Sequence, residues 1–302
     1  MWRGELVMTR TNEFFNNEKI SNEHYTLQIT KDHFNHRLKV DDYRGNLHLI
    51  ETELQNVVMK NAYAKTIINS RVEHVSFFIE EGYTLEAICR GYFSGNDAYI
   101  MTKYYEPTRR HSDKWIKEDE ILSKVKKLTI TPLSNLLPDH FRLRKGEIED
   151  AILLAGLYAK VFEIYPTPLN KPDYIEEVIN KGTIFYVIEN DKGKIVSAAS
   201  AEVNEKYHNA ELTDCATLLE FRKHGLMKIL LRKLELELIE NQIYCSYSIA
   251  RALSFGMNAA FYQLGYTYNG RLTNNCYIYD KLEDMNVWVK DLSTADISSA
   301  RC

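Results

Sequence analysis

The sequence lacks the features that mark several large classes of protein. No window approaches the ~18 consecutive apolar residues of a membrane-spanning helix, and the polar N-terminus has no apolar signal-peptide core. The five cysteines, Cys89, Cys215, Cys245, Cys276 and Cys302, are far apart and include no CxxC pair. They predict neither a disulfide framework nor a zinc site, and they favour a reducing, cytoplasmic location.

Nucleotide-binding motifs and a strong excess of charge are also missing. The chain contains neither GxxxxGK[ST] nor GxGxxG, which argues against a P-loop and a dinucleotide-binding fold. The formal net charge is -4, so nothing in the composition predicts binding to nucleic acid or to an anionic membrane. The nine histidines are dispersed, and we expect no metal site.

The length of 302 residues suits two domains of about 150 residues each. Residues 105–138 are charged, lack periodicity, and carry three of the six prolines. We interpret this stretch as a connection with one short helix at about 117–127. The sequence therefore predicts an N-terminal domain with its linker at 1–135 and a second domain at 136–302. We expect residues 1–25, which are polar, to be frayed.

The second half has a regular alternation of apolar patterns. It predicts the order β-α-α-β-β-β-α-β-α-β-β, which is an α/β layered domain with a mixed sheet. The predicted strands are 141–144, 183–188, 194–203, 210–217, 244–249, 266–272 and 276–279, with a hairpin joining the last two. The predicted helices are 147–162, 172–180, 225–241 and 253–264.

The most informative stretch is the strand at 210–217 followed by Arg222-Lys223-His224-Gly225-Leu226-Met227, which opens an amphipathic helix. Unpaired backbone N–H groups at a helix start bind anions, helped by the helix dipole. Gly225 allows close approach of a ligand, and the preceding basic residues add positive charge. A diphosphate would fit here. The alternative interpretation is a solvated turn before a core helix.

In its order of elements, this region resembles the GNAT superfamily of N-acetyltransferases. The superfamily's pyrophosphate loop reads Gln/Arg-x-x-Gly-x-Gly/Ala, and Arg222 and Gly225 match its first two fixed positions, whereas Met227 stands where Gly or Ala is usual. The resemblance implies a mixed, mostly antiparallel sheet and acetyl-CoA as co-substrate. It implies that acetyl-CoA contacts Cys215, Ala216, Thr217, Arg222, Lys223, His224, Gly225, Leu226, Met227 and Asn258.

Acetyl transfer to an amine requires a base, because an amine with a pKa near ~10 arrives protonated. Glu211 and Asp214 lie on the strand before the loop, and we favour Glu211 as the base, either directly or through water. Their spacing predicts that they face opposite sides of the sheet. Asp214 would pair with the acceptor's ammonium or anchor a neighbouring helix. Either carboxylate could instead be structural.

A tyrosine often protonates the departing thiolate in this superfamily. Phe261 occupies that position, four residues before Gly265, and Tyr262 is one step away. Either Tyr262 serves through a local shift, or the protein lacks this acid. Tyr262 could also be an ordinary core or surface aromatic.

Within the superfamily, three stretches resemble β-lysine N6-acetyltransferases: 211–217, 250–258 and 282–288. This resemblance implies transfer to the side-chain amine of β-lysine, the product of lysine 2,3-aminomutase, to give a compatible solute. A diamino acid needs carboxylates for its ammonium groups, which Glu163, Glu211 and Asp214 could supply, and donors for its carboxylate, which Arg251 or Asn258 could supply. Tyr165 could line the acceptor cleft or be a hydrophobic anchor of its loop, and a homodimer stays open. The alternatives are another small amine, such as lysine or a polyamine, and a non-catalytic acyl-CoA-binding sensor, which Met227 and Phe261 would permit.

The first half predicts the order β-α-β-α-β-β over residues 33–105, which matches the end of the second half. Phe78-x-x-x-Gly82-Tyr83-Thr84 repeats as Phe261-x-x-x-Gly265-Tyr266-Thr267. We interpret the first half as a degenerate GNAT-like duplicate. Arg44-Gly45-Asn46 stands at the place of a coenzyme loop without its spacing, so we expect no coenzyme A there.

Overall fold

The computed structural model describes residues 14–130, 137–279 and 281–294. The first part contains β1 (Phe15–Ser21), β2 (Tyr25–Asp32), β3 (Arg37–Gly45), α1 (Leu47–Asn61), β4 (Lys65–Ser70), α2 (Val75–Glu80), β5 (Thr84–Phe93) and β6 (Asn96–Tyr104). The connection contains α3 (Pro107–Arg110) and α4 (Trp115–Val125). The second part contains β7 (Phe141–Gly146), α5 (Ala151–Val161), α6 (Pro172–Asn180), β8 (Ile184–Asn190), β9 (Ile195–Asn204), β10 (Asn209–Thr217), α7 (Leu226–Glu240), β11 (Cys245–Arg251), α8 (Phe255–Gln263), β12 (Thr267–Ile278) and β13 (Lys281–Asp291).

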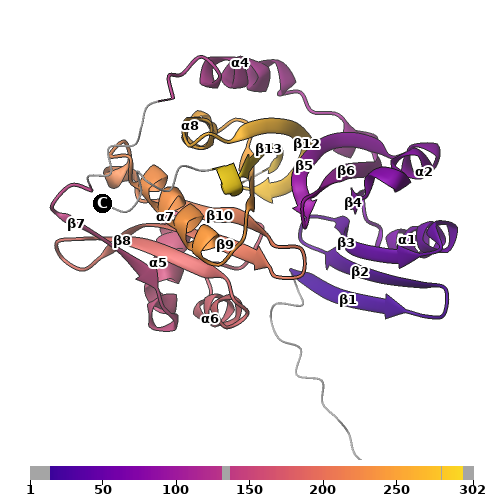
Figure 1. Ribbon diagram of the computed structural model, residues 1–302, viewed down its shortest axis with the longest axis horizontal. Coiled ribbons are helices and arrows are strands. Elements are labelled where there is room, and N and C mark those ends of the chain that lie inside the picture. Colours follow the sequence, from indigo (N-terminus) through magenta and orange to yellow (C-terminus); the bar gives the residue numbers. More distant parts are fainter. Residues whose placement is uncertain (1–13, 131–136, 280, 295–302) are drawn as a thin grey trace, which may run out of the picture.

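All strands join one 13-stranded sheet in the order β1-β2-β3-β4-β6-β5-β12-β13-β11-β10-β9-β8-β7. Within the described residues, the parallel neighbours are β3–β4 and β10–β11, and the other pairs are antiparallel. Figure 1 shows α1 and α2 packed on the first part of the sheet and α5 to α8 on the second. The predicted α/β fold with a mixed, mostly antiparallel sheet is confirmed.

The two parts of the sheet repeat one topology. Inward from one edge the order is β1-β2-β3-β4-β6-β5, and toward the same central joint from the other side it is β8-β9-β10-β11-β13-β12. In each set a helix, α1 or α7, connects the third strand to a parallel fourth strand. The layout supports the interpretation of the first half as a GNAT-like duplicate. The predicted boundary at 135/136 lies outside the described residues.

The polar N-terminal segment is more ordered than predicted. We expected residues 1–25 to be frayed, but β1 pairs with β2 in seven consecutive antiparallel positions, from Phe15–Asp32 to Ser21–Thr26. The prediction is wrong for these residues, and residues 1–13 lie outside the described part. An edge strand with a mostly solvent-facing surface carries a polar sequence, so hydropathy does not distinguish it from a loop.

The last predicted hairpin is also misplaced. Residues 267–278 form the single strand β12, and the hairpin partner is β13 at 281–291. The polar run at Thr273–Asn275 resembles a turn in sequence, but it is a bulge between Leu272 and Cys276. Asn274, with a φ of 43°, donates from its side chain to the carbonyls of the α3 segment, including His111 at 2.9 Å.

Three apolar clusters hold the sheet and its helices together. One packs below α1 and α2, and another packs among α4 to α8. The third spans the central joint and includes Ile67, Cys89, Tyr92 and Cys276. Ile68 belongs to the cluster below α1, so it and Ile67 point to opposite faces of β4. The joint cluster therefore lines the face opposite α1 and α2.

The two parts touch again on that face, away from the joint. The Lys206 ammonium, in the turn between β9 and β10, forms an ion pair with Asp42 of β3. The rings of Phe15 on β1 and Tyr174 on α6 pack edge to face with centroids 6.4 Å apart. We refer to the space bounded by these two contacts and the joint cluster as the recess between the halves.

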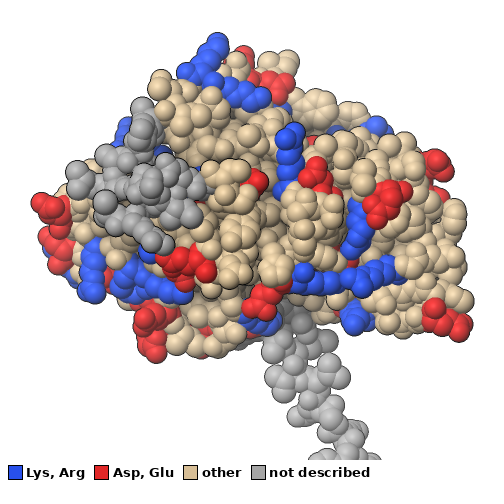
Figure 2. Space-filling model, viewed as in Figure 1, with Lys and Arg blue, Asp and Glu red and all other residues tan. Residues whose placement is uncertain are grey.

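The charged side chains on the surface are mixed. Figure 2 shows Lys and Arg interspersed with Asp and Glu over the viewed face, without a continuous area of one sign. None of the helices in the described residues is long and apolar enough to cross a membrane.

We predict that Gly270→Ala weakens the joint between the halves. Gly270 pairs with Ala87 at a φ of 140°, and a Cβ there would lie 2.3 Å from the carbonyl oxygen of Glu86. We expect the free energy of unfolding of the Gly270→Ala variant to fall by about 2 kcal/mol or more in chemical denaturation. The control is Gly95→Ala, which has a φ of 101° and open space around its Cβ. It should cost only about 1 kcal/mol, and equal losses would show that the close approach at Gly270 is unimportant.

Candidate active site

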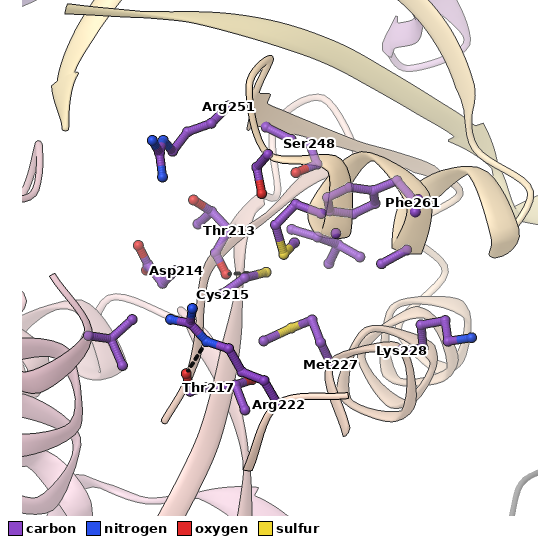
Figure 3. Close-up of a pocket in the computed structure, with 18 of the residues that line it drawn as sticks. Thr213, Asp214, Cys215, Thr217, Arg222, Met227, Lys228, Ser248, Arg251 and Phe261 are labelled. Carbon is purple, nitrogen blue, oxygen red and sulfur yellow. Dashed lines mark hydrogen bonds between the residues drawn. The ribbon is translucent and has the colours of Figure 1, made fainter. Parts of the chain in front are cut away.

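A cavity of about 680 Å³ lies where β10 and β11 separate. The strands pair in parallel only from Asn209–Cys245 to Glu211–Tyr247, and beyond that point they diverge. The start of α7 and one side of α8 close the opening. The predicted site residues that line this cavity are Tyr165, Asp214, Cys215, Thr217, Arg222, Lys223, Gly225, Leu226, Met227 and Arg251 (Figure 3).

The start of α7 presents unpaired amides to the cavity. Gly225 is the N-cap residue with a φ of 76°, and no side chain caps the helix. The first helical amides that reach an acceptor within the described residues are those of Lys228 and Ile229, both bonded to the Gly225 carbonyl. The amides of Leu226 and Met227 therefore remain available to an anion. The equivalent helix in the first half, α1, is capped by the side chain of Asn46 instead.

Arg222 is held at the mouth of this loop. Its Nε donates to the carbonyl of Thr217 at 3.2 Å, which keeps the guanidinium beside the end of β10 (Figure 3). Lys223 follows with a left-handed φ of 70°. Met227 projects into the cavity from the first turn of α7, so its side chain occupies space that a glycine would leave open (Figure 3).

A bulge shapes the middle of β10. Thr213 pairs with Ser200 and Ala216 with Ala198, so β10 has one residue more than β9 between these points. Asp214 takes up the extra length with a φ of 52°. The hydroxyl of Tyr158 donates to the Asp214 carbonyl at 2.8 Å and stabilises this conformation. The bulge redirects the side chain of Asp214, and it follows closely on Glu211–Tyr247, the last pair between β10 and β11, where the cavity begins.

The Asp214 carboxylate is buried and bonded to two hydroxyls. Ser200 Oγ donates to it at 2.7 Å and Tyr165 donates at 3.2 Å. Burial and the negative charge of Glu202 raise the pKa of Asp214 to about 7, against the lowering effect of the two hydrogen bonds. Near neutral pH this group can therefore gain or lose a proton.

Glu211 and Asp214 share one face of the sheet, which contradicts the predicted opposite orientation. Glu211 pairs across the strands with Glu202, and Glu202 lies two residues from Ser200, the partner of Asp214. The bulge adds a residue between the two carboxylates and thereby reverses the expected alternation. Glu211 is half-buried, adjoins the cavity through Asp214, and does not line it.

The pKa of Glu211 suits a general base. Burial and the charge of Glu202 raise the pKa of Glu211 to about 8, while the positive charge of Lys39 acts in the opposite direction. A carboxylate with such a pKa is a stronger base than an ordinary glutamate. Cys215 does line the cavity, but burial and the charge of Asp214 raise the pKa of its thiol, which keeps it protonated and a poor nucleophile.

The structure places Tyr262 away from the cavity. Its hydroxyl donates to the carbonyl of Lys126, after α4, at 2.9 Å, whereas the preceding Phe261 is buried and lines the cavity. Successive residues of a helix point about 100° apart, so both rings cannot face the same space. The alternative in which Tyr262 is an ordinary aromatic fits this position better than that of an acid.

Asn258 has no capacity left for a coenzyme. Its Oδ1 accepts from Trp288 Nε1 at 2.8 Å and from Asn286 Nδ2 at 2.9 Å. Its Nδ2 donates to the carbonyls of Arg251 and Ser254. The side chain is fully buried, so it supports the loop between β11 and α8 from behind and does not touch the cavity.

The remaining predicted residues fall into two groups. Ala216 is buried, and its carbonyl accepts from Ser197 Oγ at 3.1 Å, while His224 is exposed beside Phe141; neither lines the cavity. Arg251 lines the cavity, but its guanidinium donates to Glu283 at 2.9 Å and lies over the Tyr279 ring.

Sequence reasoning missed several residues of the site. Tyr158, Ser200 and Glu202 act on β10 from other elements, and no sequence motif connects them with it. Ser248 and Tyr279 line the cavity from β11 and from the turn after β12. Only their contact in the fold reveals them.

The comparisons with known proteins agree with this geometry. Residues 154–266 match the acetyltransferase (GNAT) family. N-acetyltransferase YodP of Bacillus subtilis is 37% identical, with 91% of this chain and 99% of that protein aligned. Beta-lysine N(6)-acetyltransferase of Methanosarcina mazei is 40% identical, with 83% of this chain and 100% of that protein aligned. The protein of the same name from Methanococcus maripaludis is 37% identical over 77% of this chain and 82% of its own.

Two of the solved structures that resemble this protein each cover about half of the chain. Ribosomal-protein-S5-alanine acetyltransferase from Vibrio fischeri has a TM-score of 0.46 and 13% identity, and it covers 53% of this chain and 98% of its own. A variant of spermidine N-acetyltransferase SpeG from Vibrio cholerae has a TM-score of 0.44 and 17% identity, with 52% and 96% covered.

We predict that Asn258→Ala lowers the free energy of unfolding by about 2–4 kcal/mol, because Trp288 and Asn286 lose a buried acceptor. Urea denaturation followed by tryptophan fluorescence measures this change. Asn241→Ala is the control, since that exposed amide makes a single bond, to the carbonyl of Glu237. It should cost less than about 1 kcal/mol. Equal stability of the Asn258 variant and the parent protein would refute the supporting role.

Proposed function

Because the chain belongs to the GNAT family of acetyltransferases, we propose that it transfers the acetyl group of acetyl-CoA to the side-chain amine of β-lysine. The observation that carries this proposal is one continuous site. It joins an anion-binding helix start to the bulged strand that carries Glu211 and Asp214. Two relatives that align over most of this chain are named for the same reaction.

The residues around the cavity suit acetyl-CoA. The free amides of Leu226 and Met227, with Arg222 and Lys223 beside them, would hold the pyrophosphate. Acetyl-CoA supplies the acetyl group as a thioester, which the acceptor amine attacks. The apolar wall that Phe261 and its neighbours form would hold the pantetheine arm, and exposed edges of β10 near Cys215 and Thr217 would bind its amides.

Glu211 is the proposed base. The acceptor's ammonium must lose a proton before its nitrogen can form the new amide bond. With its pKa raised to about 8, Glu211 can accept that proton near physiological pH. Asp214, beside it on the same face, attracts the ammonium and orients it together with Tyr165. Both groups lie next to the bulge where the acetyl group would sit.

The reaction needs no covalent intermediate on the protein. Cys215 is protonated and lies in a strand, so direct attack of the amine is the simpler route. A thiol with a pKa near ~8.5 is a good leaving group as its thiolate. The absence of Tyr262 from the residues that line the cavity therefore does not prevent transfer.

The structure of the proposed acceptor indicates which reaction would produce it. A β-amino acid that retains the carbon chain of lysine requires an aminomutase acting on lysine, so lysine 2,3-aminomutase would act upstream. The N-acetylated product loses one positive charge. The resulting zwitterion has no net charge, a property that suits a compatible solute.

We expect a thiol-release assay with acetyl-CoA to show β-lysine strongly preferred over α-lysine, spermidine and a lysine-containing peptide. Turnover on a different amine would support acetyltransferase activity and contradict β-lysine as the acceptor. Binding of acetyl-CoA by calorimetry without turnover on any amine would contradict catalysis and support the acyl-CoA-binding sensor.

We predict that Glu211→Gln lowers kcat/KM by about 100-fold below pH 8 and less above it. The protonated form of Glu211 is inactive as a base, so the activity of the parent protein should rise with pH and level off above about 8. The variant depends on the free amine alone, and its activity should keep rising toward the amine's pKa of ~10. Glu205→Gln, at an exposed carboxylate, is the control and should behave like the parent protein.

The role of Glu211 is decided by kcat/KM measured against pH, and by the affinity for acetyl-CoA, in both variants and in the parent protein. An inflection near 8 that persists in Glu211→Gln would exclude Glu211 as the titrating base. Loss of acetyl-CoA affinity comparable to the loss of turnover would show a structural residue.

A further inference from the structure

The geometry points to an acceptor subsite shared by the two halves, in which Lys39 of β3 binds the carboxylate of a diamino acid and Glu202 of β9 binds its second ammonium. This inference rests on the proposed function, because it extends the same site beyond Glu211. It assigns the first half, which lacks a coenzyme loop, a role in selecting the acceptor.

Lys39 lies on the face of the sheet that carries the carboxylates. It pairs with Ile67 of β4, and Ile67 belongs to the apolar cluster that spans the central joint. Tyr247 packs against that cluster and is the strand partner of Glu211. Glu211 in turn pairs with Glu202. The joint cluster is therefore the apolar floor between Lys39 and the two carboxylates.

The curl of the sheet brings the two sides of this floor toward each other. The ion pair between Asp42 and Lys206 ties β3 to the turn after β9 on one side. The contact between Phe15 and Tyr174 closes another side. Asn209 Nδ2 also donates to the carbonyl of Tyr92 at 2.7 Å across the halves. β3 has an extra residue between Val40 and Asp42, which pair with the consecutive Ile29 and Gln28 of β2. This bulge places Lys39 and Asp42 on the same face, although they are three residues apart.

The charges of the recess act on one another without direct pairing. Within the described part of the chain, Lys39, Glu202 and Glu211 form no hydrogen bond or ion pair through their side chains. The charge of Lys39 nevertheless lowers the pKa of both carboxyls against the raising effect of burial. Glu202 stays accessible to water, although surrounding atoms desolvate it. These three groups are close enough to interact and too far apart to satisfy each other.

Other charged groups in the area already have partners. Arg37 donates to Asp32 at 2.7 Å, and Arg251 donates to Glu283 at 2.9 Å. Asp214 accepts from Ser200 and Tyr165. Unlike Arg37 and Arg251, Lys39 has no ion-pair partner among the described residues. It is therefore better placed to bind a carboxylate than Arg251, which would first have to leave Glu283.

The unpaired groups complement one class of ligand. Glu211 and Asp214 meet the attacking amine, which leaves Glu202 and Lys39 for one further positive and one further negative charge. A diamino acid brings both. A plain diamine would leave Lys39 unpaired, and a monoamino acid would leave Glu202 unpaired, and desolvated charges without partners reduce affinity.

The repeat of the fold explains how the two halves came to oppose each other. β3 and β10 each have nine residues, and Lys39 and Glu211 both occupy the third position, three before an aspartate. The joint between β5 and β12 is antiparallel, so equivalent positions of the two halves lie on the same face of the sheet. A cation in one half therefore shares a face with a carboxylate in the other, and the contacts that curl the sheet turn them toward each other.

The test compares Lys39→Met and Glu202→Gln on three amines: β-lysine, 1,4-diaminopentane, which lacks the carboxylate, and 6-aminohexanoate, which lacks the second amine. We expect Lys39→Met to raise KM at least about tenfold for β-lysine and 6-aminohexanoate and to leave 1,4-diaminopentane within about twofold. Glu202→Gln should raise KM for β-lysine and 1,4-diaminopentane and spare 6-aminohexanoate. Because both charges act on the pKa of Glu211, kcat is compared at a pH well above 8, where Glu211 is ionised, and there it should change little in both variants.

Lys60→Met, at an exposed lysine of α1, is the control and should match the parent protein on all three amines. An equal effect of Lys39→Met on ligands with and without the carboxylate, or no effect, would overturn the assignment and move the carboxylate to Arg251.

Calorimetric titration with the same three ligands separates the proposed subsite from the proposed acetyltransferase activity. Charge-dependent binding without turnover would contradict the proposed acetyltransferase activity and support the subsite. Turnover that does not distinguish the three amines would support the activity and contradict the subsite.

Discussion

A single extra residue in β10 organises the site. Asp214 absorbs it in a left-handed conformation, which Tyr158 holds through a hydrogen bond to the Asp214 carbonyl. Because the bulge interrupts regular pairing next to the point where β10 and β11 diverge, one strand can leave the other and open the cavity. The same bulge brings Asp214 to the face of Glu211. The cavity and the shared face of the two carboxylates therefore both depend on the backbone conformation of β10.

The electrostatics follow from that arrangement. Glu202, Glu211 and Asp214 lie on one face, and burial raises the pKa values of all three. The charge of Glu202 raises the pKa values of Glu211 and Asp214 further. In an isolated strand these would be ordinary acids. In the folded protein Glu211 and Asp214 exchange protons near neutral pH, as the proposed acetyl transfer to an ammonium requires. Lys39 limits the shift and keeps the recess from becoming uniformly negative.

The repeat explains why so large a first half is retained without a coenzyme loop. Its helix α1 is capped by its own Asn46, so its start is closed to a phosphate. Its sheet nevertheless continues the second half through Gly270 and Ala87 and contacts it again through Asp42 and Lys206. One copy thus retains the anion-binding helix start, and the other shapes the space opposite it.

The sequence by itself determined the order of elements in the second half, the position of the loop before α7 and the family, because periodicity and loop spacing are local. The repeat was also readable, from Phe78-x-x-x-Gly82-Tyr83 and its copy. Tertiary structure alone decided which carboxylates share a face, since a bulge shifts side-chain parity without a sequence signal. It also decided that Tyr262 and Asn258 face away from the cavity and that Lys39 lies on the sheet face of the joint cluster, because these depend on packing between segments far apart in the chain.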